Sequence, residues 1–231
     1  MLKARNSILL LGIAWLMLLS PVATGADENI SKLIDKTLQR MEKGGIKNVW
    51  AISSDLKKIA NREKEQAVGQ ILAALPDMNP VVKLGCAKTL FDIQEEKAAV
   101  PILLELAALK KEKEVRLGAI ALLGTADFLD EKIVGEVESL LNNTLDQETD
   151  PDILIETSKS LHMISLSYHK KAKAVLKEML ASDIHEIKIN AALALAEIED
   201  LESSRNVLQE IQYEPSYEGR LAKRILKAWD V

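Results

Sequence analysis

One repeated position of this chain carries a cation three times. Lys83, Arg116 and Lys188 each stand second in a similar stretch, directly after Val or Ile. Such a ladder could bind an anionic partner, or its members could form ion pairs within the fold, where exposed pairs contribute little. Together with Lys88 and Lys159 in the same stretches, they are the predicted partner-binding residues.

The chain has one cysteine, Cys86. A lone cysteine cannot form an intramolecular disulfide. In the repeat it aligns with Ala119, Thr157 and Ala191. We therefore expect a small buried residue rather than a nucleophile or an attachment point.

The histidines are His162, His169 and His185. None forms the tight pair that zinc sites use, although His162 and His169 could share a helix face. His185 is expected in a solvated loop. We predict no metal and no cofactor, with zinc as the alternative.

Other catalytic patterns do not stand out. The carboxylates are spread along polar faces, and none is isolated in apolar sequence as an acid of raised pKa would be. The sequence has no Gly-x-Ser-x-Gly, Gly-x-Gly-x-x-Gly or phosphate-loop pattern. The sequence favours a protein that is not an enzyme.

The elements that must position these residues form a repeat. Stretches 82–90, 115–123, 153–161 and 187–195 can be superimposed, with steps of 33, 38 and 34 residues. This period is typical of stacked helical hairpins, each of which needs its neighbours to bury its apolar face. We predict partner helices over 64–75, 98–109, 131–145, 170–180 and 202–211, a helix over 46–60, and end caps over 30–43 and 217–229.

Residues at helix ends support these boundaries. Asn79 and Asp150 precede prolines and should cap helices that begin at the proline. Pro101 is predicted in the first turn of its helix. The step of 38 predicts an extended loop over 141–149. The aromatic residues near the ends are expected to seal the capping helices: Trp50, Tyr213, Tyr217 and Trp229.

Each repeated helix is apolar on more than one side. The first, fifth and ninth positions of the stretches share one face, with a small residue in the middle. The third position is also always apolar: Leu84, Leu117, Ile155 and Ile189. A helix of this kind is expected between its own partner and both neighbouring units.

These stretches resemble HEAT repeats, in particular the short bacterial type also seen in phycobilin lyases. Residues 114–119 (Glu-Val-Arg-Leu-Gly-Ala) and 99–106 (Ala-Val-Pro-Ile-Leu-Leu-Glu-Leu) carry the resemblance most clearly. It covers 79–229 well and 46–76 weakly, and the unit over 151–168 departs from it at Leu154, Glu156 and Ser158. The resemblance implies an all-α, right-handed superhelix of about five helical hairpins with end caps. It also implies a docking scaffold in which the repeated cation bonds to the next unit.

The N-terminus has the pattern of a secretory signal peptide. Lys3 and Arg5 precede an uncharged run over 8–19, and small residues follow. We predict a signal peptide over 1–26 and one helical-repeat domain over 27–231, periplasmic or secreted, with no stable membrane span after cleavage. The alternative is a protein anchored in the membrane by an uncleaved N-terminus.

Composition narrows the partner class. Of 231 residues, 3% are aromatic, and the net charge of −5 disfavours nucleic acid as a partner. The predicted function is therefore an exported, non-catalytic scaffold that binds another protein or a peptide. One alternative is a regulatory or docking module of a secreted hydrolase, and a less favoured one is an enzyme similar to phycobilin lyases.

Overall fold

A computed structural model describes residues 25–125 and 130–229 of the chain. The predicted signal peptide falls almost wholly outside these ranges. Within them the chain is all-helical and contains no strand. The eleven α-helices are α1 Gly25–Ala60, α2 Lys64–Ala74, α3 Pro80–Asp92, α4 Glu96–Ala107, α5 Lys113–Gly124, α6 Glu131–Gln147, α7 Pro151–Ile164, α8 His169–Leu180, α9 His185–Glu197, α10 Leu201–Ile211 and α11 Tyr217–Trp229.

The first helix is bent at Gly45. This residue has φ 59° and ψ −169°, so α1 consists of two helical segments joined at a kink. Glycine adopts a positive φ without the steric penalty that a side chain brings. The predicted boundary at Gly44-Gly45 between an N-terminal cap and the first repeat helix is thus confirmed, but no loop separates the segments.

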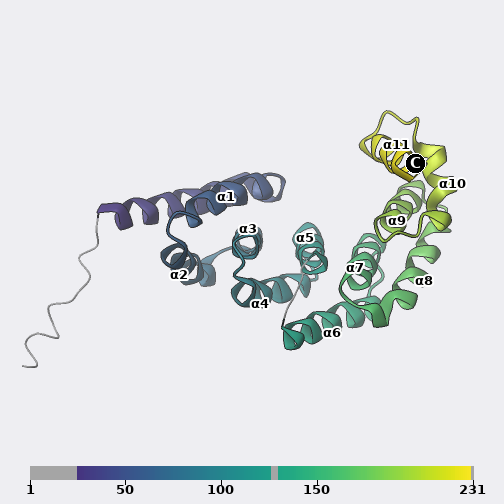
Figure 1. The fold of residues 1–231 in the computed structure, drawn as a ribbon. Helices are drawn as coiled ribbons and strands as arrows, with labels where there is room; N and C mark the ends of the chain where they lie inside the picture. The colour runs from purple at the N-terminus through teal and green to yellow at the C-terminus, as the bar shows by residue number, and fades with distance from the viewer. Residues whose placement is uncertain (1–24, 126–129, 230–231) are drawn as a thin grey trace, which may run out of the picture.

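The helices pack in sequence as two curved layers. Helices α4, α8 and α10 each pack on the odd-numbered helices that precede and follow them, whereas α2 packs mainly on α1 and α6 mainly on α7. The odd-numbered helices also pack on one another, from α1 through α3, α5, α7 and α9 to α11. In Figure 1 the odd-numbered helices follow the inside of the arc and the even-numbered helices its outside. We call the inside of the arc the concave face.

The repeat positions recur at similar depth in the inner layer. The small middle residues Cys86, Ala119, Thr157 and Ala191 are all buried, as are Leu90, Leu123, Leu161 and Leu195 four positions later. Val82, Val115 and Ile153 are also buried, and Ile187 is partly buried against the core. Small residues at the middle position let neighbouring helices approach closely. The predicted sandwiched position of these helices is confirmed.

Two predicted helix caps are present. The Asn79 side chain accepts a hydrogen bond from the Val82 amide at 3.0 Å. The Asp150 side chain accepts from the Asp152 amide at 3.0 Å and from the Ile153 amide at 3.3 Å. Proline follows each cap at the first helical position, where its missing N–H leaves no bond unmade.

Two local predictions are wrong. The residues added by the step of 38 extend α6 to Gln147 instead of forming a loop, because Leu141 and Leu145 continue the buried stripe of that helix. Pro101 lies inside α4 and not in its first turn, since the helix begins at Glu96. The Pro101 side chain is exposed there.

The terminal aromatic residues do not seal the caps as predicted. Trp50, Tyr213, Tyr217 and Trp229 are all exposed. The last inner helix, α11, instead buries small and aliphatic side chains: Gly219, Ala222 and Leu226. Aliphatic residues of this size suffice to close the last hairpin, which leaves the aromatic rings free for other contacts.

The unit that departs from the repeat pattern is nevertheless regular. Helix α7 runs unbroken from Pro151 to Ile164, and Ser158 and Ser160 are buried in it. The Ser160 hydroxyl donates to the Ile120 carbonyl of α5 at 3.0 Å, so this polar residue joins two inner helices. Ser158 has no such partner among the described residues.

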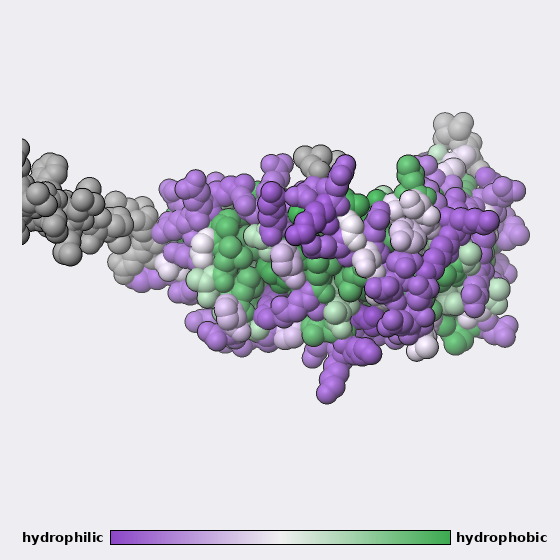
Figure 2. All heavy atoms as spheres, turned by 90° about the horizontal axis from the view of Figure 1, so that it is seen from below, coloured by the Kyte–Doolittle hydropathy of each residue, from purple (hydrophilic) through white to green (hydrophobic). Residues whose placement is uncertain are grey.

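The outer face of the array is mostly polar (Figure 2). Seen from below the view of Figure 1, hydrophilic side chains cover most of the outer face, and apolar side chains show between them (Figure 2). Over the described ranges, every helix is too short or too polar to cross a membrane.

Candidate functional site

The concave face is hollowed toward its C-terminal end. A groove of about 440 Å³ lies along α5, α7, α9 and α11. Its apolar lining comes from all four helices: Leu117, Ile155, Leu193, Ala194 and Leu221. Because each helix contributes the side that faces away from its outer partner, the groove follows directly from the stacking of the inner layer.

Acidic side chains surround this apolar floor. The groove is lined by five carboxylates and a single ammonium group, that of Lys159. The carboxylates belong to Asp152, Glu156, Glu186, Glu197 and Glu218. A hollow lined by one sign of charge concentrates ligands of the opposite sign.

The one cation in the groove is already paired. The ammonium of Lys159 lies 3.0 Å from a carboxylate oxygen of Glu156 and 3.0 Å from one of Glu197. Burial opposes its charge, but these two carboxylates outweigh burial and raise the pKa of Lys159. Lys159 therefore holds α7 to α9 and leaves the groove acidic.

The remaining three carboxylates of the groove differ in their partners. Asp152 pairs with Lys113 at 2.6 Å, and Lys113 does not line the groove. Glu186 and Glu218, by contrast, have no cationic partner among the described residues. Both stand in the first turn of their helices, α9 and α11, where a negative charge is favourable but remains available to a ligand.

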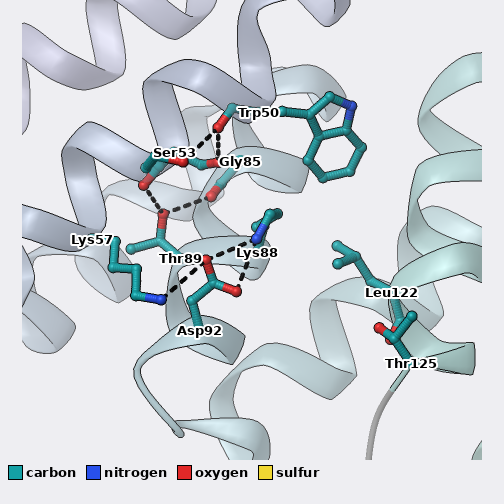
Figure 3. A network of polar contacts seen from close by, with 10 residues as sticks. Trp50, Ser53, Lys57, Gly85, Lys88, Thr89, Asp92, Leu122 and Thr125 are labelled. Carbon is teal, nitrogen blue, oxygen red and sulfur yellow. Dashed lines mark hydrogen bonds and ion pairs between the residues drawn. The ribbon is translucent and has the colours of Figure 1, made fainter.

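Exposed aromatic residues lie at two places on the inner layer. Tyr217 lines the groove and is 60% exposed. Trp50 on α1 is 38% exposed, and its ring lies against Gly118 of α5, next in sequence to the groove residue Leu117. In Figure 3 the indole points away from α1 toward the side where Leu122 and Thr125 lie. Trp and Tyr are the residue types that most often dominate protein interfaces.

Polar contacts hold the helix that carries Trp50 in place. The Thr89 hydroxyl lies 3.3 Å from the Ser53 carbonyl oxygen and 2.9 Å from the Gly85 carbonyl oxygen (Figure 3). Lys57 on α1 lies 3.7 Å from a carboxylate oxygen of Asp92 on α3. The contacts of Ser53 and Lys57 join α1 to α3 within the two helical turns that follow Trp50.

The first two members of the predicted basic ladder form bonds within the fold. Lys83 pairs with Glu105 of α4 at 2.9 Å. Arg116 donates to the Ala107 carbonyl at 2.9 Å and forms a short ion pair with Glu148. Both cations therefore join an inner helix to the neighbouring outer helix or to a turn.

The other predicted binding residues do not come together. Lys88 pairs with Asp92 one turn along α3 at 2.7 Å, and Lys159 is engaged in the groove as described above. Lys188 is partly buried and has no ion-pair partner within the described ranges. Of the five predicted residues only Lys159 lines the groove. Contact of these residues with a partner stays a prediction.

The pair of Arg116 and Glu148 belongs to a larger network. Glu148 accepts hydrogen bonds from the Asp150 amide at 3.0 Å and the Thr149 amide at 2.8 Å. These bonds, chiefly that from Asp150, together with Arg116 lower the pKa of Glu148 against the effect of burial. An adjoining hollow of about 480 Å³ is lined by Arg116, Glu148 and Thr149 of this network and by other side chains, most of them polar.

The residues singled out for nucleophilic or metal chemistry are not arranged for it. Cys86 is buried as predicted, and burial raises the pKa of its thiol to about 12. His162 and His169 lie on separate helices and stack with their ring centroids 3.7 Å apart. Their in-plane lone pairs therefore cannot meet at one ion. His185 begins α9 rather than lying in a loop, and it is exposed 3.3 Å from Glu214.

Two comparisons bear on the identity of the chain. No family model matches this sequence, and no curated protein is similar enough to count as a relative. The resemblance to HEAT repeats therefore stays a prediction that depends on the residues of the repeat itself. Among the described residues, no group of three or more histidine, cysteine or acidic side chains could hold a metal ion.

Sequence reasoning missed the acidic groove. The signal was present one position before the repeated stretches, where Glu114, Asp152 and Glu186 all carry a carboxylate. An acid at this position is also typical of the first turn of a helix, and all three residues lie in first turns. Only the stacking of α7, α9 and α11 shows that two of these acids line one hollow.

Proposed function

We propose that this protein is an exported, non-catalytic scaffold that binds another protein through its concave face. In this proposal the helices form a right-handed superhelix of HEAT-like hairpins, and the inner layer presents the groove. The observation that carries the proposal is the groove itself, which is lined by partly exposed Leu117 and Leu221 together with the exposed ring of Tyr217. Apolar and aromatic surface left open on a soluble fold marks an interaction site.

The shape of the site also favours a macromolecular partner. Its lining is spread over four helices and continues toward Trp50 on α1, so a partner can contact several repeats at once. Extended concave surfaces of this kind are how stacked repeats bind other chains. The aromatic rings would supply the central contacts, since truncation of such residues commonly costs an interface about 2 kcal/mol or more.

The test is capture of a partner from the native envelope fraction by the purified protein. We expect Trp50→Ala and Tyr217→Ala to reduce the amount of the specific captured protein by about tenfold or more. Trp229→Ala and Tyr213→Ala are the controls, because these rings are also exposed but do not line the groove as Tyr217 does, and their helices α11 and α10 do not pack on α5, on which the Trp50 ring lies. Equal capture by all four variants would contradict the assignment of binding to the concave face.

A further inference from the structure

Resting on the function proposed above, we infer that the occupant of the groove is a basic segment of a partner protein, in which Lys or Arg residues flank apolar side chains. The apolar part would lie on Tyr217 and Leu221, which are exposed and partly exposed, and the cations would lie against Glu186 and Glu218. The inference depends on charge complementarity and on the chemistry of the groove floor.

The groove carries negative charge that the fold does not fully balance. Of its five carboxylates, Glu156 and Glu197 share Lys159, and Asp152 pairs with Lys113. Glu186 and Glu218 remain without a cation among the described residues. An anionic segment would meet uncompensated repulsion here, whereas a cationic one would neutralise both groups.

The groove also has apolar residues next to these carboxylates. Buried Leu193 and Ala194 of α9 form the bottom of the groove, and Leu221 of α11 is partly exposed in it. The same two helices carry Glu186 and Glu218. Tyr217 stands beside Glu218 and is largely exposed. A ligand that offered charge alone would leave this apolar surface in water, so apolar side chains between the cations complete the match.

A second copy of the chain fits less well. Helix α11 carries Arg220, Lys223, Arg224 and Lys227, and all four are exposed. Its buried apolar residues, including Ala222 and Leu226, face its own chain. The α11 helix of another copy could thus offer charge to the groove but little apolar surface, which favours a different protein as the partner.

The test measures binding of labelled synthetic peptides to the full chain. The probe is a peptide in which Lys alternates with Leu, compared with one in which Glu replaces Lys and one in which Ser replaces Leu. We expect the Lys and Leu peptide to bind most tightly, and its affinity to fall as salt is raised. In the variant Glu186→Gln/Glu218→Gln the affinity should fall about fivefold to tenfold.

The matched control is Glu131→Gln/Glu202→Gln. These two acids also stand exposed in the first turn of helices, α6 and α10, but they lie outside the groove. The control variant loses the same amount of charge from the same helix position. Its affinity for the Lys and Leu peptide should therefore stay within about twofold of that of the unchanged protein. Glutamine keeps size and hydrogen bonding, and circular dichroism checks the fold of both variants.

Three results would overturn the inference. The first is that Glu186→Gln/Glu218→Gln and Glu131→Gln/Glu202→Gln lose the same affinity for the Lys and Leu peptide. The second is that the Glu peptide binds as tightly as the Lys peptide. The third is that the protein associates with itself and that only Glu186→Gln/Glu218→Gln abolishes this association. The last would make a second copy the occupant. If the aromatic variants lose the native partner while Glu186→Gln/Glu218→Gln keeps it, the basic occupant is wrong and the scaffold function stands.

Discussion

The ring of Trp50 on α1 lies against Gly118 on α5, across the helix α3 that separates them in the array. A Cβ atom on Gly118 would come within 3.1 Å of Cζ2 of Trp50 and within 2.9 Å of Cδ2 of Leu84. The absent side chain therefore lets an aromatic residue of the first unit reach the third. This contact connects the N-terminal end of the concave face to the helix that begins the acidic groove.

The variant Gly118→Ala should displace this indole. The Trp50 ring is partly exposed and can move outward, but the fully buried Leu84 must shift as well. Alanine is a better helix former than glycine by about 1 kcal/mol, which offsets part of this cost, so we expect a net loss of at most about 2 kcal/mol. In a chain that begins at residue 27 and carries Trp229→Phe, Trp50 is the only tryptophan. Its fluorescence emission should shift to longer wavelength. An unchanged spectrum would show that the ring does not lie on Gly118.

A second glycine tolerates no side chain. A Cβ atom on Gly124, the last residue of α5, would lie 2.6 Å from the Cα atom of Ser160 in α7. Because the obstacle is backbone, we expect Gly124→Ala to lower the free energy of unfolding by about 1–3 kcal/mol. Gly69→Ala is the control, since Gly69 lies exposed in α2 with nothing near its Cβ position. There alanine should stabilise by about 0.5–1 kcal/mol. Chemical denaturation measures both, and equal effects would contradict the close packing of α5 on α7.

The repeated cation is predicted to contribute unequally to stability. Arg116 bonds to Ala107 and Glu148 and is mostly shielded from solvent, so Arg116→Gln should cost about 1–3 kcal/mol. Lys188 occupies the same repeat position without an ion-pair partner among the described residues. Lys188→Gln should therefore change stability by less than about 0.5 kcal/mol. Denaturant titration of the two variants provides the comparison, and a larger loss for Lys188→Gln would be the contrary result.

Protonation of His162 should destabilise the fold. Burial and then the neighbouring His169 and Lys173 lower the pKa of His162 to about 4, and Asp200 only partly offsets them. The unfolded chain binds this proton near the ordinary pKa of about 6.5. Between these values the unfolded state holds more protons, so the free energy of unfolding falls as the pH is lowered from 6.5 toward 4.

The measurement for this prediction is chemical denaturation at pH 7 and at pH 5. His162→Gln should lose less stability between the two than the unchanged protein does. His185→Gln serves as the control, because His185 is exposed at the start of α9. A pH dependence that His162→Gln leaves unaltered would assign the effect to other groups.

The all-α class and most helix positions could be predicted because the signals are local. The caps at Asn79 and Asp150 and the repeated buried residues around Cys86 each depend on a few neighbouring positions. The helix over 131–145 was predicted, but the repeat length could not show that the loop expected over 141–149 is mostly helix, since an insertion can lengthen either a helix or a loop. The superhelix handedness stays a prediction.

The candidate site was far less predictable. A charged residue in a repeat has the same local pattern whether it faces a neighbour or a ligand. Arg116 and Glu186 illustrate this, since the first is used within the fold and the second has no cation beside it in the part of the chain that the structure describes. The exposure of Tyr217 likewise depends on how α11 packs, which involves Gly219 and Ala222 rather than the aromatic ring. Only tertiary packing distinguishes these cases.

The most direct test of the central claim is site-specific photo-cross-linking in living cells. A photoreactive amino acid would replace Tyr217 or Asn190 in the groove, or Ala174 or Gln209 on the outer helices α8 and α10, where both side chains are exposed. The account predicts that one discrete protein is cross-linked from the groove positions and not from the outer ones. Cross-links to that protein from the outer positions alone would contradict it.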